Sequence, residues 1–284
     1  MIRGVDERVW AFDLEWVPDP LAGRLLQGLP DSTPDAAVLA QMWRAGGATA
    51  VDPTPFLKTA VCRIVSIAVV ERRVRGPEEA PSLNLLSLPR DPKSAEEARE
   101  ANVIGTFLSA LGKNRPQLVG YNSHDSDLKI LIQRALVLGV QATEFARRPD
   151  KPWQGVDYFA RGSDSNVDLK EIVGGWGKAV PSLHEIAVQS GIPGKLDVDG
   201  NDVARLWLDG RLDEILAYNE MDALTTYLVW LRLAHFAGHF TTPEYAEEQT
   251  RVRALVEREI SGGRPHLARY LEEWDRLRAA IAKR

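Results

Sequence analysis

The chain has 284 residues, 44% of them hydrophobic, and a formal net charge of −5 at pH 7. This length fits one large domain or two small ones, and the acidic balance excludes a protein that coats nucleic acid through a broadly basic surface. The single cysteine, Cys62, excludes an internal disulfide and fits a reducing compartment. The N-terminus lacks a signal-peptide pattern and no apolar run has the length of a membrane span, so we expect a cytoplasmic protein without membrane contact.

The N-terminal half alternates between apolar runs and proline-rich segments. Val9–Leu14 predicts a buried strand, and Arg63–Glu71 and Ser82–Leu88 predict a second and a third strand. The prolines within residues 18–60 interrupt any regular pattern, so we expect an insertion there, with one short helix over 34–43.

Helical signals dominate the rest of the chain. A capping-box pattern at Ser94 and Glu97 predicts a helix that continues to about residue 111, and a similar pattern at Ser182 and Glu185 predicts a short helix. Residues 147–166 are expected to form a loop. The remaining predictions are a strand over 117–121 and helices over 127–138, 201–208, 211–235, 244–260 and 266–283.

The succession of strands and helices predicts an α/β fold with a mixed central sheet flanked by helices. We expect a main domain over residues 1–240, with the insertion 18–60 between its first two strands. Residues 241–284 are expected to form a C-terminal helical extension. This extension is the candidate contact surface for a protein partner or a second copy of the chain.

Acidic residues that could share one site occur in three separate segments of the chain. Asp13 and Glu15 close the first strand, and their side chains share one face because side chains alternate along a strand. Two neighbouring carboxylates repel each other, and a divalent metal ion removes that conflict. Asp127 begins a predicted helix, and Tyr218 and Asp222 share one face of the longest helix. This order suggests a two-metal site for phosphoryl transfer.

The acidic residues of each of these three segments also have a purely structural interpretation. Asp13 and Glu15 can be solvated acids at a strand end. Asp127 can stabilise a helix N-terminus through the helix dipole. Tyr218 and Asp222 can be a surface pair on an amphipathic helix. Their occurrence together, in order and on suitable elements, favours the metal site.

The same residues resemble a known superfamily. Phe12-Asp13-Leu14-Glu15 resembles the first motif of the DEDD exonucleases, which have a ribonuclease-H-like fold. Tyr121-Asn122 with Asp127 resembles the second motif, and Tyr218-x-x-x-Asp222 resembles the third motif of the tyrosine-bearing (DEDDy) branch. Within this branch the chain is most similar to the predicted 3′–5′ exonucleases related to the proofreading domain of family B DNA polymerases. Three further stretches carry this similarity: 191–195, 209–215 and 222–228.

Two positions depart from the family pattern. Ser126 stands where the family usually has an aromatic residue before the second-motif acid, and this leaves Asp125 as an alternative to Asp127. Trp16 stands where the family usually has threonine, which changes the wall beside the metals. His124, in the same polar stretch as Ser126, is either close to a metal or phosphate or simply a solvated loop residue.

The resemblance implies a metal-dependent 3′–5′ exonuclease that hydrolyses nucleotides from the 3′ end of single-stranded nucleic acid. The resemblance favours DNA over RNA as the substrate. No residue in the sequence indicates a contact to a 2′-hydroxyl group. Two Mg²⁺ or Mn²⁺ ions would be held by Asp13, Glu15, Asp127 and Asp222. Tyr218 would orient the attacking water, because a free tyrosine has a pKa of about 10 and is a poor base near neutral pH.

Three residues are candidate substrate contacts. Trp16 can stack on the terminal base or belong to the core. Asn122 can hold the second-motif loop or contact a phosphate. Lys195, together with Lys170 and Lys178, can contact phosphates or be a solvated charge.

Two alternative functions keep the same fold. The first is a non-catalytic nucleic-acid-binding or adaptor module, and the presence of all four acids and the tyrosine weighs against it. The second is a structure-specific endonuclease whose cleft is reshaped by the insertion 18–60. A substrate without a free 3′ end distinguishes the endonuclease from the exonuclease.

Overall fold

A mixed five-stranded sheet forms the centre of the protein. The computed structural model describes residues 2–76, 79–151, 154–175, 179–196 and 200–283. The strands are β1 (Arg8–Pro18), β2 (Cys62–Arg73), β3 (Ser82–Leu88), β4 (Gln117–Gly120) and β5 (Asn166–Asp168). They are ordered β3-β2-β1-β4-β5 across the sheet. The pairs β3–β2 and β2–β1 are antiparallel, and the pairs β1–β4 and β4–β5 are parallel. The predicted α/β class with a mixed sheet is confirmed.

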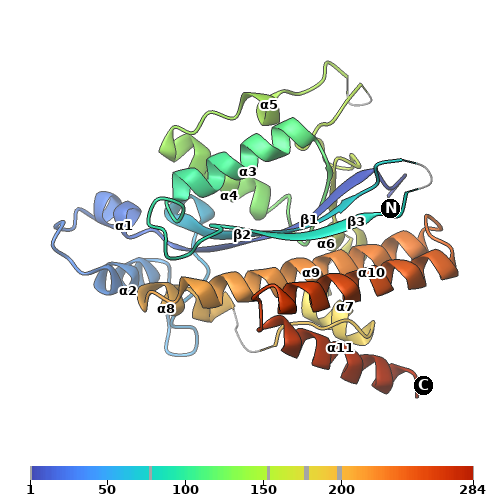
Figure 1. The fold of residues 1–284 in the computed structure, drawn as a ribbon. Coiled ribbons are helices and arrows are strands. Elements are labelled where there is room, and N and C mark those ends of the chain that lie inside the picture. The colour runs from blue at the N-terminus through green and yellow to red at the C-terminus, as the bar shows by residue number, and fades with distance from the viewer. Residues whose placement is uncertain (1, 77–78, 152–153, 176–178, 197–199, 284) are drawn as a thin grey trace.

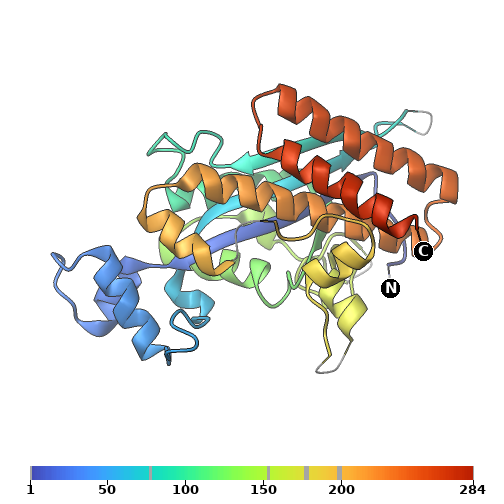
Figure 2. The ribbon, with the colours of Figure 1, turned by 90° about the horizontal axis from the view of Figure 1, so that it is seen from below.

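Helices cover both faces of this sheet (Figures 1 and 2). One face carries α3 (Glu100–Asn114), α4 (Asp127–Leu138) and the short α5 (Thr143–Ala146). The other face carries α6 (Leu169–Gly174), α7 (Leu183–Gln189), α8 (Gly200–Leu208), α9 (Leu212–Phe236), α10 (Thr242–Ser261) and α11 (Leu267–Ile281). The insertion forms α1 (Pro20–Gln27) and α2 (Asp35–Ala45) at one end of the sheet, followed by a 3₁₀ turn at Thr59–Val61. Within the described residues, no helix is both long enough and apolar enough to cross a lipid bilayer.

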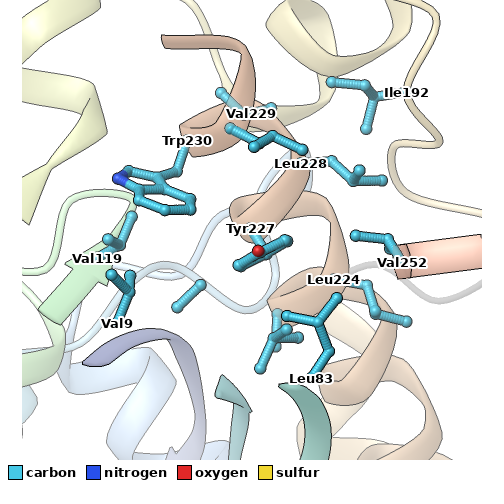
Figure 3. Packing of buried hydrophobic residues seen from close by; sticks show 14 of the residues in the cluster. Val9, Leu83, Val119, Ile192, Leu224, Tyr227, Leu228, Val229, Trp230 and Val252 are labelled. Atoms are coloured by element: carbon cyan, nitrogen blue, oxygen red, sulfur yellow. The ribbon is translucent and has the colours of Figure 1, made fainter. Parts of the chain in front are cut away.

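Alternation along β1 divides its side chains between two hydrophobic clusters. Val9 and Ala11 pack toward α9, whereas Trp10 and Phe12 pack toward α3 and α4. On the α9 side, Tyr227 and other fully buried residues lie against the sheet (Figure 3). Burying a large apolar side chain contributes about 1.5–3 kcal/mol, so these layers hold β1 at a fixed depth between the helices.

The longest helix, α9, is buried on nearly all sides because α10 and α11 cover the face that the sheet leaves open. Val252 and Leu255 of α10 and Tyr270 and Trp274 of α11 belong to the same hydrophobic cluster as the core of α9. The residues of the predicted C-terminal extension therefore share the core of the main domain. The boundary at residue 240 stays a prediction.

Buried ion pairs attach the insertion to the domain. Arg134 of α4 donates from Nη2 to Asp19 at 2.8 Å and from Nε to Glu100 of α3 at 2.7 Å, and all three side chains are buried. Asp19 also caps α1 by accepting the backbone N–H of Leu21. Removing the arginine would leave two buried carboxylates without a counter-charge, which is costly. The start of the insertion is thereby fixed against α3 and α4.

Some predicted boundaries are wrong. The helix expected from Ser94 begins at Glu100, because the capping box is incomplete: Ser94 Oγ accepts the N–H of Glu97 at 3.3 Å, but the Glu97 carboxylate accepts the N–H of Asp91. Residues 94–99 form turns instead. The box at Ser182 is complete, and α7 follows it as predicted.

Candidate active site and metal centre

The structure brings three acidic side chains together at one end of β1. One carboxylate oxygen from each of Asp13, Glu15 and Asp222 lies within 4.8 Å of the others. Alternation places Asp13 and Glu15 on the face of β1 that meets α9, and α9 contributes Asp222. All the donors are carboxylate oxygens, which suit hard divalent cations such as Mg²⁺ and Mn²⁺.

Asp127 and Tyr218 line the same cavity. Asp127 is the first residue of α4, is only 4% exposed, and accepts the backbone N–H of Leu14 from β1. Among the described residues it lies in the cavity wall but outside the close group of three acids. Tyr218 is 4% exposed and its hydroxyl hydrogen-bonds to Asp222, one helical turn away on α9.

Burial and mutual repulsion keep these acids from ionising freely. Burial, followed by the charge of Asp222, raises the pKa of Asp13 and of Glu15 well above the ordinary values. Burial also raises the pKa of Asp127 to about 7 and that of Asp222 to about 6. A bound cation offsets the repulsion between neighbouring carboxylates and favours their ionised form, so the residues present fit divalent metal ions.

Aromatic side chains line the same cavity as the acids. The cavity has a volume of about 390 Å³, and Trp16, Trp43 and Phe56 line it together with the acidic cluster. The rings of Trp16 and Phe56 meet edge to face, with centroids 6.2 Å apart, and Phe56 is 77% exposed. Trp16 also packs against the hydrophobic cluster beneath α3 and α4. The sequence patterns single out Trp16 but not Trp43 or Phe56, because both belong to the insertion.

Asn122 holds the loop between β4 and α4. Its backbone has a positive φ of 69°, a conformation that asparagine tolerates better than most residues. Its side-chain amide donates to Ser126 and its Oδ1 accepts the ammonium of Lys170 at 3.0 Å. Its backbone N–H donates to Asp168 Oδ1 at 2.9 Å. Asn122 therefore lines the cavity as part of a braced loop, and Asp168 is a bracing residue that the sequence did not predict.

Two lysines take different places around the site. Lys195 lines the cavity, and its positive charge opposes the effect of burial on the pKa values of Asp13 and Asp222. Lys170 is engaged with Asn122, as described above. Lys178 lies outside the described residues.

The structure separates the two candidate acids of the second motif. The Asp125 side chain is 56% exposed, forms an ion pair with Arg161, and is not among the described residues that line the cavity. Asp127 is buried and lines the cavity. This geometry favours Asp127 as the metal ligand.

A comparison with known protein families matches most of the chain. Residues 54–274 match a family described as a predicted 3′-5′ exonuclease related to the exonuclease domain of PolB. The matched range contains Asp127, Tyr218 and Asp222 and begins after Asp13 and Glu15, which the fold adds to the same cavity. No curated protein matches the chain. The chain belongs to the family of predicted 3′–5′ exonucleases related to the exonuclease domain of PolB.

Proposed function

We propose that the protein is a metal-dependent 3′–5′ exonuclease that removes nucleotides from the 3′ end of single-stranded nucleic acid, with DNA preferred over RNA. The observation that carries this proposal is the grouping of Asp13, Glu15 and Asp222 within 4.8 Å, in a cavity that also contains Asp127 and Tyr218. Family membership supports the same reaction and direction.

The four acids would hold two Mg²⁺ or Mn²⁺ ions. Asp13, Glu15 and Asp222 form the closer set, and Asp127 would complete the coordination of the second ion, directly or through water. Bound ions of this kind lower the pKa of the attacking water and stabilise the leaving 3′ oxygen.

Tyr218 would orient the attacking water. Burial, followed by the charges of Asp222, Glu15 and Asp13, raises its pKa far above the ordinary value, so its hydroxyl stays protonated at neutral pH. A protonated hydroxyl cannot remove a proton as a base, and because its one hydrogen is donated to Asp222, its oxygen would orient the water by accepting a hydrogen bond from it. Its bond to Asp222 aims the hydroxyl at the acidic cluster.

The aromatic side chains of the cavity would bind the terminal nucleotides. Trp16 and Phe56, with Trp43 beside them, offer ring surfaces on which bases of any sequence can stack. Lys195 lines the cavity and would contact a phosphate. Because the chain is acidic overall, these local stacking and phosphate contacts would bind the strand in place of a broad basic surface.

A cleavage assay tests the proposal. Single-stranded DNA and RNA labelled at the 5′ end are incubated with the wild-type protein, the Asp13→Ala variant or the Asp125→Asn variant, in Mg²⁺, Mn²⁺ or EDTA. We expect a metal-dependent ladder that shortens from the 3′ end with wild type and Asp125→Asn. Since ions at such sites contribute several kcal/mol, Asp13→Ala should slow cleavage on the order of a thousandfold.

Two controls separate the alternatives. A 3′-phosphorylated strand and a circular strand both lack a free 3′ hydroxyl, so an exonuclease leaves them intact and an endonuclease cuts the circle. Undiminished cleavage by Asp13→Ala would refute the two-metal assignment. Binding without cleavage by the wild type would favour the adaptor function.

A further inference from the structure

A second group of potential metal ligands includes a residue of the loop that precedes α4. His124 belongs to this loop, Asp168 ends β5, and Glu171 lies in the first turn of α6. One ligand atom from each residue lies within 4.8 Å of the other two. None of the three belongs to the acidic cluster of the proposed active site.

The separations suit a small ion. His124 Nδ1 lies 3.5 Å from Glu171 Oε2 and 3.8 Å from Asp168 Oδ2. Nitrogen and oxygen ligands about 2.0–2.2 Å from a tetrahedral ion stand about 3.3–3.6 Å from each other. The distance from His124 to Glu171 already lies in this range, and the distance from His124 to Asp168 exceeds it by only a few tenths of an ångström.

The His124 ring is buried without a hydrogen-bond partner. Its side chain is only 6% exposed, and neither Nδ1 nor Nε2 makes a hydrogen bond in the described structure. Nδ1 is within ion-pair range of the two carboxylates but lacks hydrogen-bond geometry to either. Buried polar groups are seldom left unpaired, so this ring nitrogen points to a ligand between it and the carboxylates.

The two carboxylates are held by further hydrogen bonds, as metal-binding carboxylates usually are. Asp168 Oδ2 accepts the backbone N–H of His124 at 3.0 Å, and Asp168 Oδ1 accepts the backbone N–H groups of Asn122 and Lys170. Glu171 Oε1 accepts Arg161 Nη1 at 2.5 Å, which leaves Oε2 facing His124. The Glu171 side chain is 36% exposed and offers a path from solvent.

We propose that His124, Asp168 and Glu171 form a structural site for one divalent transition-metal ion, with zinc as the best match. The imidazole ligand favours zinc and its neighbours in the first transition row over magnesium or calcium. Three protein ligands leave one tetrahedral position for water. An ion here links the loop of residues 121–127 to β5 and α6. It thereby stabilises the position of the first turn of α4, which contains Asp127.

Zinc titration of the full-length chain tests this site apart from the proposed active site. The background variant Asp13→Ala/Asp222→Ala removes two acids of the catalytic cluster. After treatment with EDTA and desalting, it is titrated with Zn²⁺ by calorimetry, and its melting temperature is recorded with and without the ion. We expect one saturable Zn²⁺ per chain and a raised melting temperature.

Two further substitutions in this background locate the ion. His124→Gln and Glu171→Gln should each weaken Zn²⁺ binding at least tenfold. His266→Gln is the matched control, because His266 also faces a carboxylate, that of Glu220 at 2.8 Å, and should bind Zn²⁺ like the background. Absence of saturable binding in the background variant, or unchanged affinity in both His124→Gln and Glu171→Gln, would overturn the proposal. Glu171→Gln is partly exposed and keeps the test usable if His124→Gln does not fold.

Discussion

Asp13 and Asp222 come from the first strand and the longest helix, yet each places a carboxylate oxygen within 4.8 Å of the other. Burial raises the pKa of Asp13 well above its ordinary value and that of Asp222 to about 6, and each carboxylate makes ionisation of the cluster harder. The folded chain therefore binds protons more tightly here than the unfolded chain does. This relationship has a measurable effect on stability.

The metal-free protein should lose stability as pH rises from about 4 to 7. A carboxyl with a raised pKa in the folded state stabilises the fold below its unfolded pKa of 3.8, and this contribution is lost as pH passes the folded values of about 6 for Asp222 and about 7 for Asp127. Melting in EDTA at pH 5 and pH 7.5 measures the effect. For a chain of this size, about 1 kcal/mol shifts the melting temperature by about 2–4 °C.

The same experiment contains its controls. Added Mg²⁺ or Mn²⁺ should restore stability more at pH 7.5 than at pH 5, because the ions bind the ionised carboxylates. The Asp13→Asn/Asp222→Asn variant should show a flatter pH dependence in EDTA, whereas Asp125→Asn should behave like wild type. A melting temperature that rises between pH 5 and pH 7.5 in EDTA would contradict the assignment.

Tyr218→Phe should slow cleavage about tenfold to a hundredfold and leave metal binding nearly unchanged. The substitution removes one hydroxyl that would position the attacking water without taking its proton, so we expect a smaller effect than the roughly 10²–10⁴-fold that general acids and bases typically contribute. Single-turnover cleavage and Mn²⁺ titration measure the two properties. An unchanged rate would exclude Tyr218 from the mechanism. A Tyr158→Phe variant, which loses a buried hydroxyl bonded to Pro116 away from the cavity, is the matched control.

Asp127→Asn should reduce cleavage far more than Asp125→Asn. Asp127 is buried in the wall of the cavity, whereas the Asp125 carboxylate faces solvent and Arg161. Both substitutions remove one negative charge from the same loop, so the difference reports position and not net charge. Rates measured at saturating Mn²⁺ compare the two. The reverse ranking would mean that Asp125 is the metal ligand.

Phe56→Ala should weaken binding of single-stranded DNA by about 1–3 kcal/mol, which is the usual value of one base–aromatic stack. Phe56 is 77% exposed, so its truncation should leave the fold intact. Affinity is measured with the Asp13→Ala background to prevent cleavage. Val51→Ala changes a 96% exposed residue of the same insertion that does not line the cavity, and it should have no effect. Equal affinities for the two variants would rule out stacking on Phe56.

Local patterns were sufficient to place the acids. The alternation of β1 determines that Asp13 and Glu15 share a face, and the period of α9 determines that Tyr218 and Asp222 do. The start of α4 at Asp127 also follows from local signals, since its apolar face and its terminal glycine are close in sequence. The same residues form the short sequence motifs that carry the resemblance to the family.

Other parts of the site depend on contacts that a linear pattern does not contain. Strand β5 has only three residues and is defined by its pairing with β4, for example Leu118 with Asn166. Helix α1 begins with the Asp19 cap and a proline, signals that the many other prolines of the insertion obscure. Trp43 and Phe56 reach the cavity through tertiary contacts of the insertion, among them the Trp16–Phe56 ring contact and the ion pair of Asp19 with Arg134.

The distance along the chain between β1 and α9 also determines when the acidic cluster can assemble during synthesis. Asp13 and Glu15 are made before α9, and the cluster lacks its third acid until α9 has been made. A nascent or truncated chain that ends before Leu212 has neither Tyr218 nor Asp222. The proposed nuclease would therefore be inactive toward nearby nucleic acid until α9 has been synthesised and has packed against β1.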